Sequence, residues 1–402
     1  MARRGARSRM ITIAAVLALA VSVSALPAGA GESGETIKVM VIHEASAGVA
    51  NPEIPDGAIA AAEAFNKKDG IGGSEVEVIV CDTNNDPNTA AECGRQAIDE
   101  GVVALIGVLT PHSGSFMTLM EENQIPSIGV VAAGVADFTS PASFPVTGGL
   151  PATAGDLPRF LADDGAERIS IAHIDLAEAA LIQTFADTTL GLVGQEVIND
   201  VPVPQGAPDM SSYVEAALAN DTDGILVALS GQDAVNFVIA AKQAKPDVKL
   251  AVISTEPGAF QEALGADAAG IIQGLANLPP LTVKTAEGKR FLKELKKAGF
   301  DESSGFRLNS WLSMQVLKQV ADDLPEVTGP AVFEALNAST GIETGLTPPL
   351  QWSTPADTGV DLITRVFNLC QLAVKLTKGT KVKPMTGTFF DAFADAECET
   401  PS

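Results

Sequence analysis

Apolar and polar positions along the chain alternate between two patterns, short apolar runs and longer amphipathic stretches. The first runs, "TIKVMVIH", "EVEVIVCD" and "VVALIG", are rich in β-branched residues and predict strands. The stretches between them, "DGAIAAAEAFNKKDG" and "PNTAAECGRQAIDEG", have helical spacing and end at Gly70 and Gly101. Asp86 or Asn88 is placed to cap the second helix. Strands alternating with helices predict parallel sheets that helices cover on both faces.

A second series of the same kind follows, with "RISIAHID", "EVINDVPVP", "GILVALS" and "VKLAVIST" as its strands. The change from one series to the next lies near residues 145–148. Beyond about residue 282 the chain is mostly helical, and it closes with "PPLQWS" and "DLITRVFNL", which we expect to be strands. The fold class expected is therefore α/β, with two lobes that each contain a doubly wound parallel sheet.

The first 30 residues have the pattern of an export signal rather than of a folded element. Four arginines precede the apolar run "MITIAAVLALAVSVSAL", and "AGA" then offers a cleavage site before Gly31. A retained membrane anchor is the alternative. We expect a secreted protein of the periplasm or cell-wall space.

The net charge of the chain limits the classes of molecule that could be its partner. The formal net charge of −24 argues against nucleic acid or an anionic membrane as the main partner, because both require clustered Lys and Arg.

The four cysteines are even in number, which in an exported protein suggests two disulfides. Three pairings are open, of which Cys81–Cys93 with Cys370–Cys398 is the most local. A metal site is the rival interpretation, but no C-x-x-C spacing supports it, and we expect neither metal nor cofactor.

The stretch "LTPHSGS" interrupts the third apolar run with small hydroxyls, a histidine and a glycine. In open parallel sheets, ligands bind outside the carboxyl ends of the strands, and a following helix directs free N–H groups to the same place. This stretch is thus a candidate ligand contact. The alternative is an ordinary loop that Ser113 or Ser115 caps.

Each of the three histidines, His43, His112 and His173, follows or ends a predicted strand. They could face one cleft together with Glu44, Asp175 and Glu256. Three interpretations remain open: independent and partly buried histidines, contacts to a polar or anionic ligand, or a metal site.

Catalytic motifs are not found in the sequence. It has no Gly-x-Gly-x-x-Gly after the first strand, no Gly-x-x-x-x-Gly-Lys-Ser/Thr and no Gly-x-Ser-x-Gly. His112 and Ser113 are neighbours in one turn, which does not make a nucleophile–base pair. We therefore expect a binding protein and not an enzyme.

The order of these motifs resembles the type I periplasmic substrate-binding proteins of ABC transporters, in particular the branched-chain amino acid (leucine/isoleucine/valine) binding family. The segments that carry the resemblance are "DGAIAAAEAFNKKDGIGG", "CDTNNDPNTAAECGRQAI", "VVALIGVLTPHSGS", "IPSIGVVAAG", "APDMSSYVEAALANDTDGILVALSGQDA" and "PPLQWS". It implies two lobes, joined by three hinge crossings, that close on a small ligand. The implied parts are residues 31–146 and 281–348 for the first lobe, and 147–280 and 349–402 for the second.

The resemblance also implies roles for particular positions. Thr110 and Ser113 match the turn that holds an amino acid carboxylate. Ala132, Ala133 and Gly134 match the turn that offers carbonyl groups to the ammonium. Glu256 lies near the family's acidic ammonium partner, and Ser230 follows a strand where an aromatic residue is usual. Beyond the resemblance, we expect Asp175 to meet the ligand from the second lobe and His112 to lie near both lobes.

One departure affects the ligand. Ala179 and Ala180 stand where such proteins usually have an aromatic residue and a glycine, so the cleft need not bind leucine. We expect a monomer that binds a small polar ligand, an amino acid or a related amide or carboxylate, and delivers it to the permease subunits of an ABC transporter. A ligand-sensing subunit that presents the same module to a receptor is the alternative function.

Overall fold

The computed structural model describes residues 36–46, 50–176, 179–253, 257–280, 283–300, 304–379 and 381–401. They fall in one compact unit, Gly34–Ser402. The expected export signal, residues 1–30, lies outside the described residues.

The first lobe is built on a five-stranded parallel sheet with the order β2-β1-β3-β4-β5. Its strands are β1 (Ile37–His43), β2 (Val76–Asp82), β3 (Ala104–Ile106), β4 (Ser127–Ile128) and β5 (Ser143–Phe144). β1 pairs with β2 in continuous register from Ile37 opposite Val76 to His43 opposite Asp82. Because all five strands run the same way, their carboxyl ends share one edge of the sheet.

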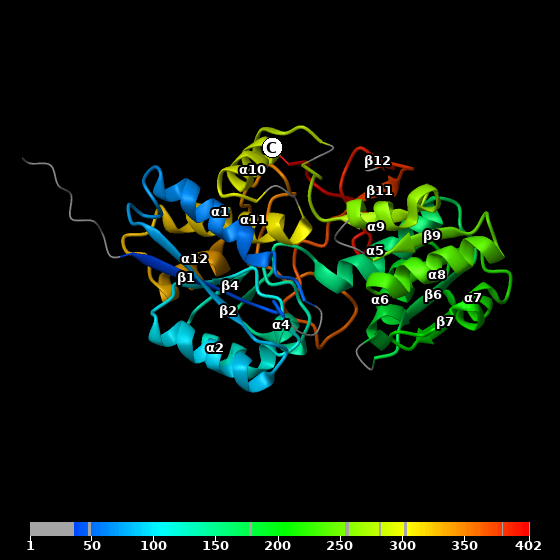
Figure 1. Ribbon diagram of the computed structural model, residues 1–402, viewed down its shortest axis with the longest axis horizontal. Helices are drawn as coiled ribbons and strands as arrows, with labels where there is room; N and C mark the ends of the chain where they lie inside the picture. The colour runs from blue at the N-terminus through cyan, green and yellow to red at the C-terminus, as the bar shows by residue number, and fades with distance from the viewer. Residues whose placement is uncertain are drawn as a thin grey trace, which may run out of the picture. The chain divides into compact units, whose positions relative to one another are not determined.

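Helices from both ends of the chain pack on this sheet. Those from the first part are α1 (Ile54–Asn66), α2 (Pro87–Asp99), α3 (Met117–Glu122) and α4 (Val135–Thr139), with a 3₁₀ turn at Ser113–Ser115. Those from the later part are α10 (Ala286–Lys297), α11 (Gly305–Ala321) and α12 (Gly329–Ala338), drawn in yellow to orange beside the blue α1 and β1 (Figure 1). The chain therefore returns to the first lobe after β10 (Ile272–Leu275), and it enters the second lobe again for β11 (Leu372–Leu376) and β12 (Val382–Pro384).

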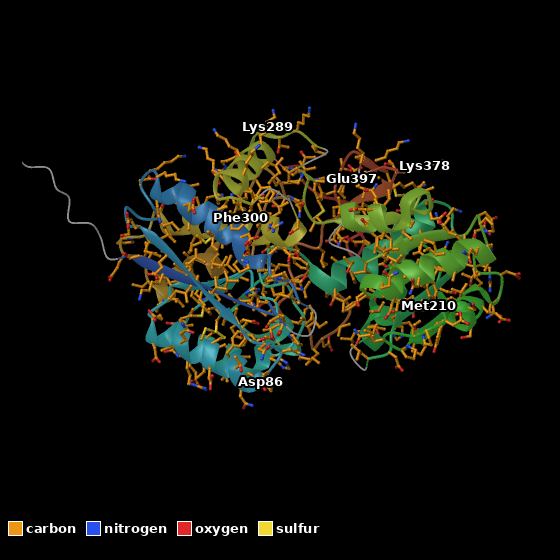
Figure 2. The ribbon with its side chains drawn as sticks, in the orientation of Figure 1. Asp86, Met210, Lys289, Phe300, Lys378 and Glu397 are labelled. Carbon is orange, nitrogen blue, oxygen red and sulfur yellow. A yellow bond between two sulfur atoms is a disulfide. The ribbon has the colours of Figure 1, made fainter. Side chains whose placement is uncertain are left out.

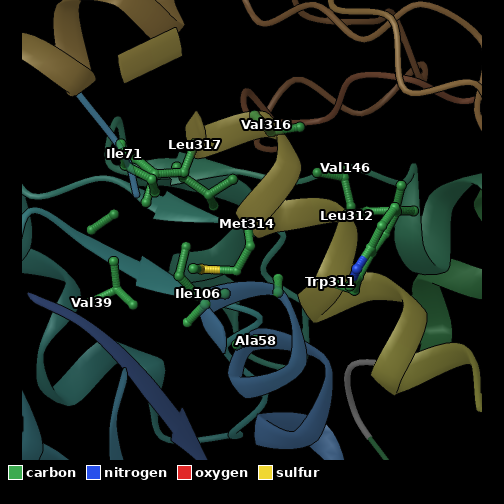
Figure 3. Packing of buried hydrophobic residues seen from close by; sticks show 14 of the residues in the cluster. Val39, Ala58, Ile71, Ile106, Val146, Trp311, Leu312, Met314, Val316 and Leu317 are labelled. Carbon is green, nitrogen blue, oxygen red and sulfur yellow. The ribbon is translucent and has the colours of Figure 1, made fainter. Parts of the chain in front are cut away.

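Two apolar cores lie on the two faces of the first sheet. One joins α1, α10, α11 and α12 to the sheet, and the other joins α2 and α3. Figure 3 shows Met314 of α11 pointing toward Ile106 of β3 in the first of these cores. α1 and α11 approach so closely that a Cβ on Gly57 would overlap the carbonyl oxygen of Arg307.

The second lobe contains a seven-stranded mixed sheet with the order β12-β11-β10-β9-β8-β6-β7. β6 (Ile169–Ile174), β7 (Val197–Val203), β8 (Gly224–Ala228), β9 (Lys249–Val252) and β10 (Ile272–Leu275) are parallel, and β11 (Leu372–Leu376) and β12 (Val382–Pro384) are antiparallel. Around it lie α5 (Gly149–Asp163), α6 (Ala180–Gly191), α7 (Ser211–Leu218), α8 (Gly231–Ala244), α9 (Pro257–Leu264) and a 3₁₀ turn at Gly265–Ala268. A small hairpin, β13 (Phe390–Asp391) and β14 (Ala396–Glu397), follows the sheet. The fold class expected from the sequence is confirmed.

The two late strands expected at residues 348–353 and 361–369 are wrong. Apart from an isolated bridge between Ile342 and Leu350, neither segment forms a ladder. Their apolar residues instead anchor irregular chain in the core, where Trp352 is buried and donates through Nε1 to the carbonyl of Pro145 at 2.8 Å. Pro348 and Pro349 also lack the N–H that a ladder requires.

Both disulfides have the pairing that the sequence favoured. Cys81, in β2, is joined to Cys93 of α2, with their Cα atoms 5.9 Å apart. Cys370 is joined to Cys398 with a Cα separation of 6.2 Å, which ties the start of β11 to the chain after β14. The most local of the three possible pairings is therefore the one present.

Candidate functional site

Glu44 connects three loops at the carboxyl edge of the first sheet. Its side chain follows β1 and is only 2% exposed. Oε1 accepts hydrogen bonds from the hydroxyls of Thr83 and Thr110, each at 2.6 Å, and Oε2 accepts one from the N–H of Asn85 at 2.6 Å. A buried carboxylate needs such donors to offset its lost hydration. Glu44 thus fixes the loops after β2 and β3.

Thr110 is fully buried, and its hydroxyl is already engaged. It donates to Glu44 and accepts from the N–H of His112 at 3.1 Å. The half-buried His112 has Nε2 3.1 Å from the side-chain oxygen of Asn85. These contacts position the turn that leads to Ser113.

The two turns predicted to hold the ligand meet at Ser113 and Gly134. Ser113 is buried, and a Cβ placed on Gly134 would lie 2.7 Å from its Oγ. Gly134 therefore leaves room for the Ser113 hydroxyl. Ala132 is half-buried and Ala133 is exposed, so part of this backbone is accessible to a ligand.

Asp137, three residues after Gly134, holds the second turn. Its Oδ2 accepts hydrogen bonds from the N–H groups of Ala133 at 2.9 Å and of Gly134 at 2.8 Å, and the side chain is 1% exposed. Burial raises its pKa to about 6, although these N–H groups and the Ser113 hydroxyl act to lower it. Among the described residues, neither Ser113 Oγ nor Asp137 Oδ1 has a hydrogen bond of standard geometry.

The sequence analysis missed the role of Asp137. The signal was present, because an acidic residue at the third position of a helix commonly bonds back to the N–H groups at its start. α4 is only five residues long, and so short a helix leaves no apolar period to mark where it starts.

Asp82, at the end of β2, holds a neighbouring loop. Burial alone would raise its pKa, but the hydrogen bonds from Ala45 N–H, the Ser46 hydroxyl and Asn84 N–H hold the pKa below its ordinary value. This edge of the sheet is therefore lined with carboxylates that already have internal donors.

In the second lobe, two of the predicted residues, Asp175 and Ser230, lie just after strands and are exposed. Asp175 directly follows β6, with its N–H bonded to the carbonyl of Val203 at 3.0 Å. Ser230 precedes α8 and its side chain forms no capping hydrogen bond to that helix. Glu256 lies outside the described residues, as does the side chain of Ala180, while the neighbouring Ala179 is buried.

The three histidines contact groups of their own lobes. His43 is buried with Nδ1 3.2 Å from the carbonyl oxygen of Asn51, and His173 has Nε2 3.2 Å from a carboxylate oxygen of Asp200. Within the described ranges, no three or more His, Cys, Asp or Glu side chains are arranged to hold a metal ion. The interpretation as independent histidines fits His43 and His173 best.

In that same part of the chain, no helix combines the length and apolarity needed to cross a membrane.

Comparisons with known proteins agree with this architecture. Residues 36–364 match the family model described as periplasmic binding protein. No curated protein matches the chain.

Three solved structures illustrate the similarity in fold. An extracellular ligand-binding receptor from Verminephrobacter eiseniae is 17% identical, with a TM-score of 0.74 over 87% of this chain and 100% of that one. A leucine-binding protein from Thermotoga maritima is 18% identical, with a TM-score of 0.70 over 87% and 98%. An ABC-transporter solute-binding protein from Rhodopseudomonas palustris, in complex with p-hydroxybenzoic acid, is 20% identical, with a TM-score of 0.72 over 89% and 98%.

The family match covers most of the chain, and the two α/β lobes with their parallel-dominated sheets agree with it. This chain belongs to the periplasmic binding protein family.

Proposed function

We propose that this protein is an extracytoplasmic solute-binding protein that captures a small polar ligand between its lobes and delivers it to the permease of an ABC transporter. The observation that carries the proposal is the meeting of two turns at Ser113 and Gly134. There a buried hydroxyl lies beside partly accessible backbone at the carboxyl edge of a parallel sheet. Ligands of open α/β sheets bind at that edge.

The ligand class we propose is a small carboxylate, either an amino acid or a related acid or amide. Leucine and p-hydroxybenzoic acid, named with two of the similar structures, both carry a carboxyl group. Ser113 and the turn Ala132–Gly134 would hold that group on the first lobe, with Thr110 fixing the turn and His112 beside it. Asp175, Ser230 and Glu256 would meet the ligand from the second lobe.

The residues at the positions where the family usually has aromatic side chains do not support leucine as the ligand. Ala179 and Ala180 stand where an aromatic residue would be expected, and the only Tyr, Tyr213, lies on α7 against the core of the second lobe. We therefore propose recognition through hydrogen bonds rather than through aromatic stacking, and a monomer as the working form.

A thermal-shift screen of the exported chain tests this proposal. Amino acids, small amides, carboxylates and sugars are added separately, and titration calorimetry follows for each compound that raises the melting temperature. A ligand that binds only the folded state raises that temperature, and at a fixed concentration a tighter ligand raises it more. The proposal expects hits among carboxylates. Hits confined to sugars would refute the ligand class, and a screen without hits would count against solute binding.

A further inference from the structure

A basic groove runs between α1 and α10 on the first lobe. The two helices pack against each other, and the hollow between them measures about 530 Å³. Six basic residues line the groove: Lys67, Lys68, Lys289, Arg290, Lys293 and Lys297. Only two acidic residues, Glu63 and Glu294, line it. We call this surface the α1–α10 groove; it does not include any residue of the proposed ligand site.

This concentration of positive charge is unexpected in so acidic a chain. The whole chain has 26 basic and 50 acidic residues. Lys67 pairs with Glu63 at 3.3 Å, and Arg290 pairs with Glu287 at 2.6 Å. Among the described residues, the exposed amines of Lys68, Lys289, Lys293 and Lys297 form no ion pair.

Helix stability does not explain two of the lysines on α10. Lys289, Lys293 and Lys297 are each four residues apart, and like charges at that spacing destabilise a helix. Lys289 also lies near the amino end of α10, where the helix dipole disfavours a cation. The buried face of α10 packs into the core through Phe291 and Leu295, and this packing does not depend on the lysines. Lys297 lies in the last turn, where the helix dipole favours a cation, so Lys289 and Lys293 are the two lysines of this row whose charge helix stability does not explain.

We propose that the α1–α10 groove docks an acidic peptide segment of a partner protein. Successive lysines in the row rise by about 6 Å along the helix, four residues at 1.5 Å each. Alternate side chains of an extended peptide are spaced by roughly 6.6 Å. Carboxylates at every second position of such a peptide therefore match the lysine row over its whole length.

The remaining lining residues favour a peptide over other polyanions. Ala60, Ala64 and Ala286 give the groove a small, apolar surface that accepts apolar side chains between the carboxylates. Glu63 is paired with Lys67, and Glu294 accepts a hydrogen bond from Nε1 of Trp311 at 2.8 Å. Each carboxylate has further acceptor positions for peptide N–H groups, which a phosphate polymer lacks. A hollow between two helices also suits a single extended chain better than a flat lipid surface. Figure 2 shows side-chain nitrogens projecting outward from α10 around Lys289.

Fluorescence anisotropy with a labelled peptide of alternating Glu and Ala tests the proposal on the full chain. The test variant is Lys289→Glu/Lys293→Glu. The matched control is Lys378→Glu/Lys383→Glu, which makes the same charge change at exposed lysines outside the groove. The groove variant should weaken binding about tenfold or more, and the control should change it by less than about twofold. Higher salt should weaken binding to the wild type.

The substituted lysines are exposed, so we expect both variants to fold, and a melting temperature close to that of the wild type would show this. If the charge reversal impairs folding, Lys289→Gln/Lys293→Gln repeats the test with a smaller change. The proposal is overturned if the wild type does not bind the peptide, or binds the matched peptide of Gln and Ala equally well. The proposal would also be overturned if the control variant weakened peptide binding as much as the groove variant does. So would sedimentation showing that the groove mediates self-association, or binding to phosphatidylglycerol vesicles with which the peptide does not compete.

Discussion

At the scale of single residues, Ser113 and Asp137 define the candidate site more sharply than the sequence could. The sequence placed Thr110 and Ser113 at a strand end, because hydroxyls and small residues interrupt an apolar run there, and the family resemblance implied the turn Ala132–Gly134. It could not show that the hydroxyl of Thr110 is bonded to Glu44, since that contact joins residues 66 positions apart. Such long-range pairings determine which hydroxyl is left for a ligand.

Ser113→Ala should weaken ligand binding while leaving the unliganded protein intact. Among the described residues the Ser113 hydroxyl forms no hydrogen bond of standard geometry, so its loss should remove little stability. A hydrogen bond to a charged ligand group contributes about 1.5–3 kcal/mol, or roughly ten- to a hundredfold in affinity. Calorimetry with the best ligand from the screen measures the effect. The control is Ser115→Ala in the same 3₁₀ turn; equal affinities for the two variants would rule out the proposed role of Ser113.

Asp137→Asn should change how stability depends on pH. The native pKa of about 6 lies above the ordinary 3.8, so Asp137 favours folding at low pH and that contribution is lost as the pH rises from about 4 through 6. An Asn oxygen can still accept from Ala133 and Gly134. The wild type should therefore lose about 3 kcal/mol relative to the variant across this window. Urea unfolding at several pH values measures the difference, and a constant difference would contradict the shifted pKa.

At the scale of elements, the sequence predicted long periodic segments well and short or irregular ones poorly. The parallel strands β1–β3 and β6–β9 and the helices α1, α2, α8 and α11 follow from their apolar periods, whereas β5, β11 and β12 were not predicted. Residues 361–369 were mistaken for a strand because the segment is rich in apolar residues, of which all but Leu362 are buried. Arg365 is held there by the carbonyl of Ser143, with its guanidinium near the rings of Phe144 and Phe367. Burial of that kind leaves an apolar run without any β-ladder.

The close contact of α1 with α11 should make Gly57 intolerant of any side chain. A Cβ at Gly57 would overlap the carbonyl oxygen of Arg307, a backbone atom that cannot rotate away. Gly57→Ala should lower the free energy of unfolding by about 2 kcal/mol or more. Gly191→Ala, at the end of α6, meets no atom within 4 Å and should leave stability unchanged or slightly raised. Urea unfolding compares the two variants, and similar losses for both would show that the helix contact is looser than described.

At the scale of the whole molecule, two lobes with separate cores are built from one chain that returns to the first lobe for α10–α12 and then adds β11 and β12 to the second. Alternation of strands and helices predicted the two sheets. The return of α10–α12 was implied only by the resemblance, because helical periodicity does not say which sheet a helix covers. The lobe boundaries at residues 146, 280 and 348 and the three crossings between lobes remain predictions.

The central claim is that the lobes close on a small ligand. A ligand that touches both lobes binds the closed form more tightly and shifts the population toward it. Small-angle scattering of the exported chain, with and without a saturating amount of the tightest ligand from the screen, tests this most directly. The account predicts a smaller radius of gyration with ligand, and a Ser113→Ala variant that needs a higher ligand concentration for the same decrease. An unchanged radius under proven saturation would contradict it.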